Sequence, residues 1–346
     1  MVIALDSVQP VFTLPPLETI PDDAEDKPQP GRALEEIGPF RVSSLVFGAA
    51  AWSHFYSSDT LLESDVPLRT IRLALRYGIR SFDTSPYYGV SEIVLGTALK
   101  ALEPEFPRAS YQLMTKCGRY GPDAFDYTPA TLRRSVARSL ARLHTPYLDV
   151  VYLHDTEFVA PQVGPRTEGV HAGAVGAEAE AYGLGEGQAG AVRGAGDERI
   201  LQGIAELRKM QDEGLVKRVG ITGLPLPTLL RLSILATHTA PFRPLDAVLS
   251  YGQLTLQNAT LLPFLPAFAR RAQVAQVLTA SRSRWACSRR RRPGGTPRPR
   301  PCARRRPRRC GGAKGGRAGC RRWRSGGRGA CGRGACGRGR CRRCWG

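Results

Sequence analysis

Cysteine is almost absent from the first 280 residues, which contain Cys117 and no other. A single thiol cannot form an intramolecular disulfide, so we expect this part of the chain to be a reduced, intracellular body. Long apolar runs are also missing, because no stretch approaches the roughly 20 apolar residues that span a bilayer. The N-terminus has no basic segment ahead of an apolar core, and its first charged residue is Asp6. We therefore expect no signal peptide, no membrane partner and a cytoplasmic location.

Acidic residues are missing from the end of the chain. Residues 281–346 contain 23 Arg, one Lys and neither Asp nor Glu, and they hold eight of the nine cysteines. This segment carries a formal charge of +24, against +20 for the whole chain, so the preceding 280 residues sum to −4. We divide the chain into an N-terminal extension (1–38), a body (39–281) and a tail (282–346).

The tail lacks Leu, Ile, Val and Phe, so it cannot build a buried strand or helix, and we expect it to be disordered. Its Arg, Gly, Pro, Ala, Cys and Trp are residues that GC-rich codons encode. Their abrupt dominance is typical of a shifted reading frame, which is the interpretation we favour. Two functional alternatives are weaker. The first is a basic arm, which would bind nucleic acid non-specifically through phosphate contacts. The second is a metal site at the cysteines 331, 336, 341 and 344, but these include only one C-x-x-C pair and no histidine.

The body repeats one unit: a short apolar run, a polar turn and a segment with helical periodicity. The pattern predicts seven strands, at 44–50, 79–85, 111–117, 147–155, 216–223, 245–253 and 274–281. It predicts helices between them, at 65–78, 91–102, 128–144, 198–214, 226–238 and 261–271. Most of these strands are too apolar for a sheet with one wet face, which indicates parallel strands covered by helices.

Two architectures fit such alternation, an open doubly wound sheet and a (β/α)8 TIM barrel. A dinucleotide-binding open sheet usually has G-x-G-x-x-G after an early strand, and "FGAAAWSHF" follows the first strand here. We therefore predict an incomplete barrel of about seven strands, with function on the loops after the strand C-termini. The interruption at 159–197 is rich in Gly and Ala, and we expect a flexible insertion on the rim, which is either a lid or inert length.

Four titratable residues converge on one mouth of the predicted barrel: Asp83, Lys116 and His154 at the C-terminal ends of successive strands, and Tyr88 in the loop after the second. Each alone is commonly structural, as a turn former, a packed ring or a solvated charge. Together they suit carbonyl reduction. An ammonium at Lys116, held by Asp83, would lower the pKa of the Tyr88 phenol, which then acts as general acid. His154 would orient the carbonyl oxygen.

These residues carry a resemblance. "FDTSPYYGVSEIVLGTAL", "LMTKCG" and "LDVVYLHD" resemble signature segments of the aldo-keto reductases, over roughly residues 40–281. Within that family, "FDTSPYYG" and "GITGLPLPTL" are most similar to the D-arabinose 1-dehydrogenase and L-galactose dehydrogenase group. The resemblance implies hydride transfer between NAD or NADP and C1 of a small aldose, with the same four residues as the catalytic tetrad.

The resemblance leaves the cofactor site less well assigned. Many family members hold the nicotinamide amide with Ser-Asn and Gln, where this chain has Thr222-Gly223 and "VLSYGQ". The candidate cofactor residues are Gly48, Ala49 and Thr222, and Trp52 is the candidate substrate-binding residue. Because the tail cannot supply an eighth strand or a phosphate-binding segment, we expect the chain to be poorly stable and to bind NAD(P) weakly or not at all. The alternative function is a basic-tailed nucleic-acid-binding protein on a degenerate barrel.

Overall fold

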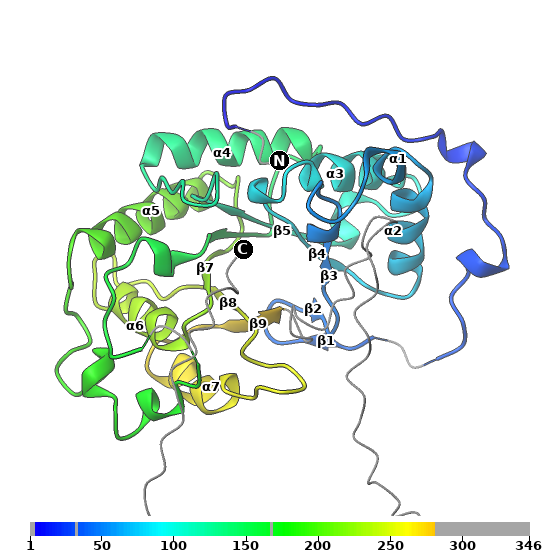
Figure 1. The fold of residues 1–346 in the computed structure, drawn as a ribbon. Helices are drawn as coiled ribbons and strands as arrows, with labels where there is room; N and C mark the ends of the chain where they lie inside the picture. Colours follow the sequence, from blue (N-terminus) through cyan, green and yellow to red (C-terminus); the bar gives the residue numbers. More distant parts are fainter. Residues whose placement is uncertain (1–3, 32–33, 167–168, 281–346) are drawn as a thin grey trace, which may run out of the picture. The chain divides into compact units, whose positions relative to one another are not determined.

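The computed structural model describes residues 4–31, 34–166 and 169–280 (Figure 1). The predictions made for 282–346, which are disorder, a nucleic-acid arm and a cysteine metal site, lie outside the described residues. Within the described ranges, no helix combines the length and the apolar character that crossing a bilayer requires.

Seven parallel strands form one sheet in the described part of the chain, and neighbours in the sheet are also neighbours in sequence. Figure 1 shows the strands curling about a common axis, as in a barrel with an open side. The prediction of an incomplete seven-stranded barrel is confirmed. In order, the strands are β3 (Phe47–Gly48), β4 (Ser81–Asp83), β5 (Gln112–Cys117), β6 (Val150–Leu153), β7 (Val219–Gly223), β8 (Ala247–Tyr251) and β9 (Gln276–Ala280).

Helices follow the strands and pack on the outer side of the sheet (Figure 1). Each buries an apolar stripe whose spacing places it on one helix face, as Leu132 and Val136 do in the fourth helix. The described helices are α1 (Asp59–Leu62), α2 (Val66–Arg76), α3 (Ser91–Ala101), α4 (Pro129–Arg142), α5 (Ala195–Asp212), α6 (Leu226–Thr237) and α7 (Leu261–Arg270). All six predicted helices are present, and α1 is an additional short one.

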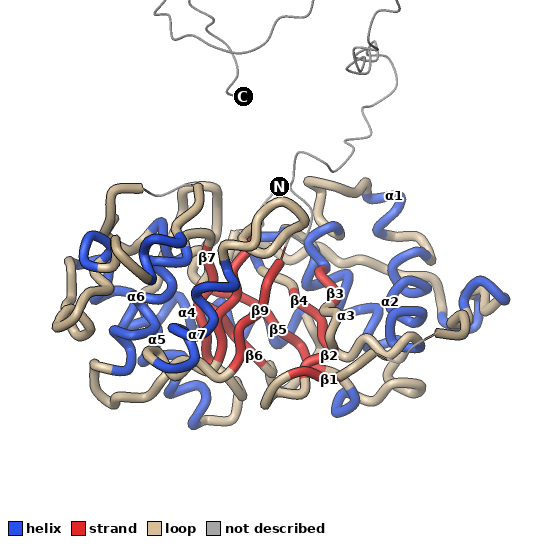
Figure 2. Tube along the Cα trace, turned by 90° about the horizontal axis from the view of Figure 1, so that it is seen from below, coloured by secondary structure: helices blue, strands red, loops and turns tan. Residues whose placement is uncertain are grey.

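A two-stranded hairpin, β1 (Glu36–Ile37) with β2 (Val42–Ser43), precedes the sheet and was not predicted. It lies at the end of the larger sheet where the strands begin (Figure 2). Gln112, the first residue of β5, donates to the Phe40 carbonyl of the hairpin turn over 2.7 Å. The hairpin therefore covers the N-terminal end of the strands and leaves the C-terminal end for function.

The inside of the cylinder is filled by side chains from alternate strand positions. Tyr152 of β6 is fully buried there, and its ring occupies the space that a side chain on Gly220 of β7 would need. A Cβ at position 220 would lie 2.7 Å from that ring and 2.4 Å from the Ala247 carbonyl. This inner apolar cluster comprises Val42, Met114, Val150, Tyr152, Ala247 and Leu249.

The two edges of the sheet differ from its centre. β3 has only two residues and pairs with β4 alone, while β9 pairs with β8 alone. All five residues of β9 are only partly buried, whereas all four residues of β6 are buried. The described sheet therefore has a buried centre and ends in two strands, β3 and β9, that each pair on one side only.

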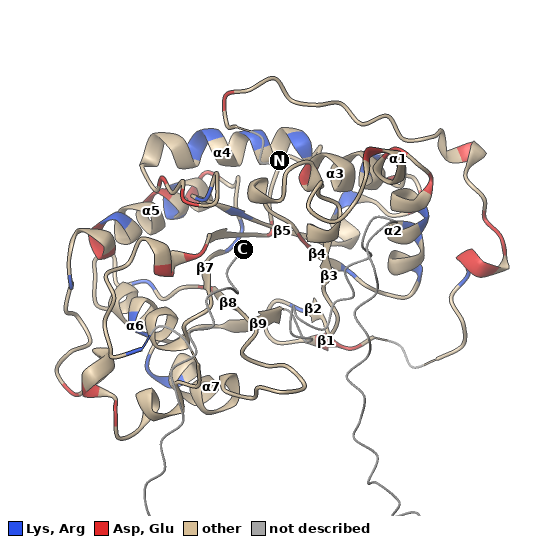
Figure 3. Cartoon of the chain, in the orientation of Figure 1, with Lys and Arg blue, Asp and Glu red and all other residues tan. Residues whose placement is uncertain are grey.

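Buried charge fixes α3 and α4 onto the sheet. Figure 3 shows basic residues along α4, and one of them, Arg142, forms a 3.0 Å ion pair with Glu92 of α3. The same carboxylate accepts hydrogen bonds from Thr115 of β5 and Ser139 of α4, each at 2.7 Å. Glu92 is fully buried and has a partner on each side, as a buried charge requires.

Residues 159–197 include two short 3-10 turns, at Ala172–Val175 and Glu180–Tyr182, and the first residues of α5. Two of their larger apolar side chains, Tyr182 and Leu184, are almost fully buried, whereas Val170 and Val192 are exposed. The flexibility expected for this insertion stays a prediction, as do the boundaries given to the extension and the body.

Candidate active site

The four residues singled out from the sequence converge at the C-terminal end of the strands. Asp83 is the last residue of β4, and Lys116 lies near the end of β5. His154 directly follows β6, and Tyr88 ends a 3-10 turn, Pro86–Tyr88, after β4. Because β4, β5 and β6 are adjacent and parallel, their ends form one side of the mouth.

The turn that carries Tyr88 is fixed by hydroxyl groups. Ser85 caps it by accepting the Tyr87 amide at 3.1 Å, and Pro86 occupies the first helical position. Ser91, at the start of α3, lies 2.9 Å from the Thr84 hydroxyl and donates to the Ala49 carbonyl at 2.7 Å. These bonds join the loop after β4 to the loop after β3.

Asp83 and Lys116 form the charged centre of the site. The Lys116 ammonium lies 2.6 Å from a carboxylate oxygen of Asp83 and donates to the Thr84 carbonyl at 2.9 Å. Burial opposes the charge on Lys116, but Asp83 and Tyr88 outweigh it and raise the pKa of the amine above its usual value. The pKa of Asp83 is also raised, because burial outweighs the attraction of Lys116. The short contact favours the ion pair as the working state.

Tyr88 lies between this ion pair and the histidine. The Lys116 ammonium is 4.8 Å from the centre of the phenol ring, and its positive charge favours the phenolate form of Tyr88. The rings of Tyr88 and His154 meet edge to face, with centres 5.8 Å apart. Burial raises the pKa of Tyr88, and Lys116 opposes this only in part. The expectation of a lowered phenol pKa is therefore wrong for the protein alone: Lys116 acts in the expected direction, but desolvation is larger.

His154 is held neutral. Its Nδ1 lies 3.1 Å from the Ser85 hydroxyl, and its backbone carbonyl accepts the Tyr127 hydroxyl at 2.6 Å. Burial, with the positive charges of Lys116 and Arg119, lowers the pKa of His154 well below its usual value. A neutral imidazole can hydrogen-bond a carbonyl oxygen without adding a charge to the site.

The structure separates the other predicted site residues. Gly48 ends β3 and is exposed, with no atom within 4 Å of the position a Cβ would take. Ala49 is buried, and Trp52 is 6% exposed and packs on Phe47 with ring centres 5.1 Å apart. Thr222 is buried, and its hydroxyl accepts the Asp155 amide at 3.1 Å. Gly48 therefore borders open space, whereas the side chains of Ala49, Trp52 and Thr222 serve packing and loop structure.

Sequence reasoning missed an arginine at the rim. Arg119, after β5, forms an ion pair with Asp155, after β6, and donates to the carbonyls of Gly121 and Pro122. Its guanidinium lies 4.1 Å from the centre of the Tyr87 ring. The two charged residues are 36 positions apart in loops without regular patterning, so no local signal in the sequence connects them.

A second carboxyl group missed by the sequence reasoning connects three strand ends. Glu157, after β6, accepts the Leu224 amide at 2.8 Å and the Tyr251 hydroxyl at 3.2 Å through one oxygen. Its other oxygen is buried without a partner among the described residues and lies 2.3 Å from the position of a Cβ on Gly223. Burial, with the negative charge of Asp155, raises the pKa of Glu157 to about 7.

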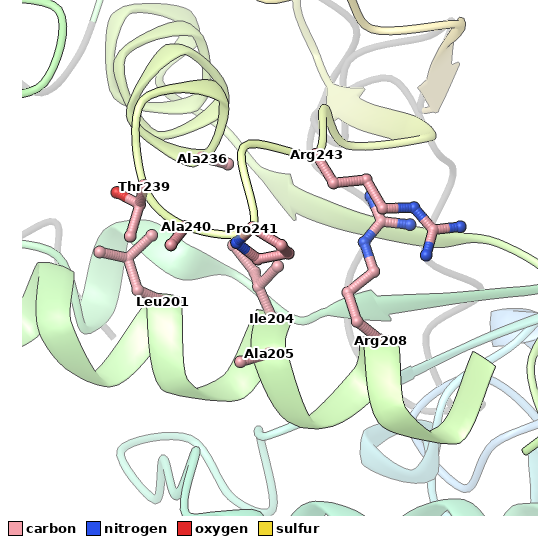
Figure 4. Close-up of a pocket in the computed structure, with 9 residues that line it drawn as sticks. All are labelled: Leu201, Ile204, Ala205, Arg208, Ala236, Thr239, Ala240, Pro241 and Arg243. Atoms are coloured by element: carbon pink, nitrogen blue, oxygen red, sulfur yellow. The ribbon is translucent and has the colours of Figure 1, made fainter. Parts of the chain in front are cut away.

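Two cavities in the described part of the chain lie elsewhere and do not include the four candidate catalytic residues. One of about 30 Å³ lies between α5 and the segment that follows α6, and Leu201, Ile204 and Pro241 line it (Figure 4). It has room for about one or two water molecules. Another, of about 350 Å³, lies beside the β1–β2 hairpin, where Gln112 and Arg218 precede or begin their strands. Both lie away from the four clustered residues.

The sequence was compared with known proteins. A family model described as "Aldo/keto reductase family" matches residues 44–267, more than half of the chain. The chain belongs to the aldo/keto reductase family. The resemblance expected from the sequence is thereby confirmed, and the tetrad of this aldo/keto reductase lies within the matched residues.

Curated relatives of this aldo/keto reductase include sugar dehydrogenases. A D-arabinose 1-dehydrogenase from Saccharomyces cerevisiae is 37% identical over 253 residues, which cover 71% of this chain and 64% of that protein. An L-galactose dehydrogenase from Arabidopsis thaliana is 33% identical over 237 residues, covering 68% and 60%. The chain thus spans less than two thirds of the length of these two relatives. A solved glycerol dehydrogenase from Gluconobacter oxydans aligns with 72% of this chain and 64% of that chain, at a TM-score of 0.47 and 20% identity.

Aldo/keto reductases work with a nicotinamide cofactor, so we asked whether the mouth fits one. The reacting end fits: a phenol, an ammonium and a neutral imidazole are in contact, and the second oxygen of Asp83 is buried without a partner. The open space beside Gly48 adds room at the same end of the strands. Thr222 does not fit as an amide-binding hydroxyl, because it is already bonded to the Asp155 loop.

Proposed function

We propose that the chain carries the catalytic machinery of an NAD(P)-dependent aldose 1-dehydrogenase, which acts on the C1 lactol or carbonyl of a small sugar such as D-arabinose. The observation that carries the proposal is the Lys116 ammonium, held 2.6 Å from Asp83 and in contact with Tyr88. This arrangement positions a phenol for proton transfer beside a neutral imidazole. The sugar dehydrogenases among the relatives support the choice of substrate class.

The nicotinamide, when bound, supplies or accepts the hydride at C1. In the oxidising direction, Tyr88 takes the proton from the C1 hydroxyl while the C1 hydride leaves, and a lactol becomes a lactone. In the reducing direction, Tyr88 gives its proton to the carbonyl oxygen. Lys116 stabilises the phenolate that remains, and Asp83 holds Lys116 in place.

Ser85 selects the tautomer of His154 that this reaction needs. Its hydroxyl oxygen accepts the Tyr87 amide proton and lies 3.1 Å from Nδ1 of His154, and in our proposal the hydroxyl donates its proton to that nitrogen. With Nδ1 as acceptor, the imidazole carries its proton on Nε2 and donates it to the substrate oxygen. The proposed substrate oxygen therefore receives hydrogen bonds from Tyr88 and His154.

Cofactor binding is expected to be weaker than micromolar. In the described sheet β3 and β9 each pair with one strand only, and Thr222 is engaged elsewhere. The cytoplasm is the location we propose for this enzyme, and Cys117, the one cysteine among the described residues, is a buried free thiol that is compatible with it. We do not propose nucleic-acid binding, since that function rests only on residues 282–346, outside the described part of the chain.

The proposal is tested with the full chain, D-arabinose and either NAD or NADP. Replacing Tyr88 with Phe removes the proton donor while keeping the ring, so turnover should fall by about 10²- to 10⁴-fold. Cofactor affinity, measured by fluorescence quenching with NADH and NADPH, should change little in this variant. Tyr56→Phe, at an exposed tyrosine, is the matched control. Turnover by Tyr88→Phe at the wild-type rate would refute the assigned role.

A further inference from the structure

Next to the proposed proton donor stands a second tyrosine, Tyr87, which the tetrad does not use. Its ring meets His154 edge to face, with centres 5.8 Å apart, and is 6.2 Å from the Tyr88 ring. Its hydroxyl has no hydrogen-bond partner among the described residues, and it is not one of the buried polar atoms that lack a partner. An accessible phenol hydroxyl therefore belongs to a ring that contacts the catalytic imidazole.

The Tyr87 ring is held on two sides. The Arg119 guanidinium lies 4.1 Å from its centre, a distance typical of cation–π stacking. Phe55, after β3, contributes a tilted ring at 6.3 Å. Arg119 is itself fixed by Asp155 and by two backbone carbonyls. Such support keeps the entropy cost of using this ring in binding small.

Tyr87 is also tied to the reacting centre through the backbone. The Ser85 hydroxyl that contacts Nδ1 of His154 accepts the Tyr87 amide, with both contacts at 3.1 Å. One side chain thus fixes Tyr87 relative to the imidazole that orients the substrate. A ligand group bonded to Tyr87 would be positioned relative to C1.

We propose that Tyr87 is a substrate-binding residue whose hydroxyl pairs with a sugar hydroxyl, so that the site selects polyhydroxylated aldoses over simple aldehydes. The inference rests on the proposed function and deepens it. A phenol hydroxyl both donates and accepts, which suits a sugar hydroxyl group. A site built to bond a hydroxyl discriminates against substrates that lack it.

The experiment compares wild type, Tyr87→Phe and the control Tyr56→Phe on D-arabinose and on pentanal, which has five carbons and no hydroxyl groups. For Tyr87→Phe, kcat/KM should fall by about two- to tenfold on D-arabinose, as expected for one lost hydrogen bond, and stay unchanged on pentanal. The control should change neither value. An equal loss on both substrates, or no loss on D-arabinose, would overturn the inference.

Binding is measured separately by saturation-transfer NMR of D-arabinose, which needs no turnover. Tyr87→Phe should weaken this binding, while Tyr56→Phe and Tyr88→Phe should retain most of it. If wild type binds the sugar and loses that binding in Tyr87→Phe without any turnover, the proposed function fails and this inference stands. If all variants bind the sugar equally, or none binds it, the inference is wrong.

Discussion

The centre of the sheet and its edges are built differently, although the same chain pattern produces both. At β4, β5 and β6, strand residues are buried on both faces, and the side chains at the strand ends are bonded to one another. At β3 and β9, strands are short or partly buried, and each has one neighbour. The residues to which we assign proton transfer thus lie on the more deeply buried part of the mouth. Of the residues expected to hold a cofactor, Gly48 and Ala49 lie at the two-residue edge strand β3, whereas Thr222 belongs to β7, which is buried throughout.

The largest effect on stability is expected where charge is buried in the centre. Glu92→Ala would leave Arg142 buried without its carboxylate, which costs about 3–5 kcal/mol. Glu213→Ala is the control, because Glu213 pairs with Arg133 where both side chains are about 40% exposed, and its loss costs at most about 1 kcal/mol. Urea denaturation followed by circular dichroism measures both. Equal losses would contradict the distinction between buried centre and exposed surface.

A pair of leucines compares centre and edge directly. Leu153→Ala in β6 removes a fully buried side chain and should cost about 2–5 kcal/mol. Leu278→Ala in β9 removes a partly buried one, and we expect a loss near 1 kcal/mol. The difference in stability is measured from the midpoints of denaturant unfolding, provided that the dependence of the unfolding free energy on denaturant is the same in both variants. If Leu278→Ala proved as costly as Leu153→Ala, β9 would be as well supported as the centre.

The effect of pH is the smallest per step, at about 1.4 kcal/mol for each pH unit. Because burial raises the pKa of Tyr88, the phenol stays protonated at neutral pH. Sugar oxidation needs the phenolate, so its rate should rise about tenfold per pH unit between pH 6 and 9, whereas carbonyl reduction should be nearly flat. His154 adds no acidic limb, since its pKa lies well below the usual value. A plateau of the oxidation rate near pH 7 would show that Lys116 outweighs burial.

Sequence patterns predicted the sheet well, because each buried parallel strand is an apolar run and each helix has a periodic apolar face. The patterns did not predict features that involve only a few residues. The β1 and β2 strands have two residues each and no pattern to detect. The burial of Tyr182 was missed because a Gly- and Ala-rich segment suggested little apolar packing.

The candidate site was predictable to a similar degree. Asp83, Lys116 and His154 stand at strand ends, so parallel neighbouring strands bring them together whatever the loops do. The net pKa of Tyr88 depends on how deeply the ring is buried, which no motif encodes. The engagement of Thr222 with Asp155 needs a loop geometry that strand patterns do not contain.

The contact between Glu157 and Gly223 ties together two positions 66 residues apart. A methyl group at 223 would collide with the free carboxyl oxygen, which ends a flexible side chain. A side chain at 223 therefore requires the Glu157 side chain to move or to be shortened, and loss of the glutamate would free this space. In a pairwise mutational scan, Gly223→Ala should therefore be better tolerated together with Glu157→Ala than alone.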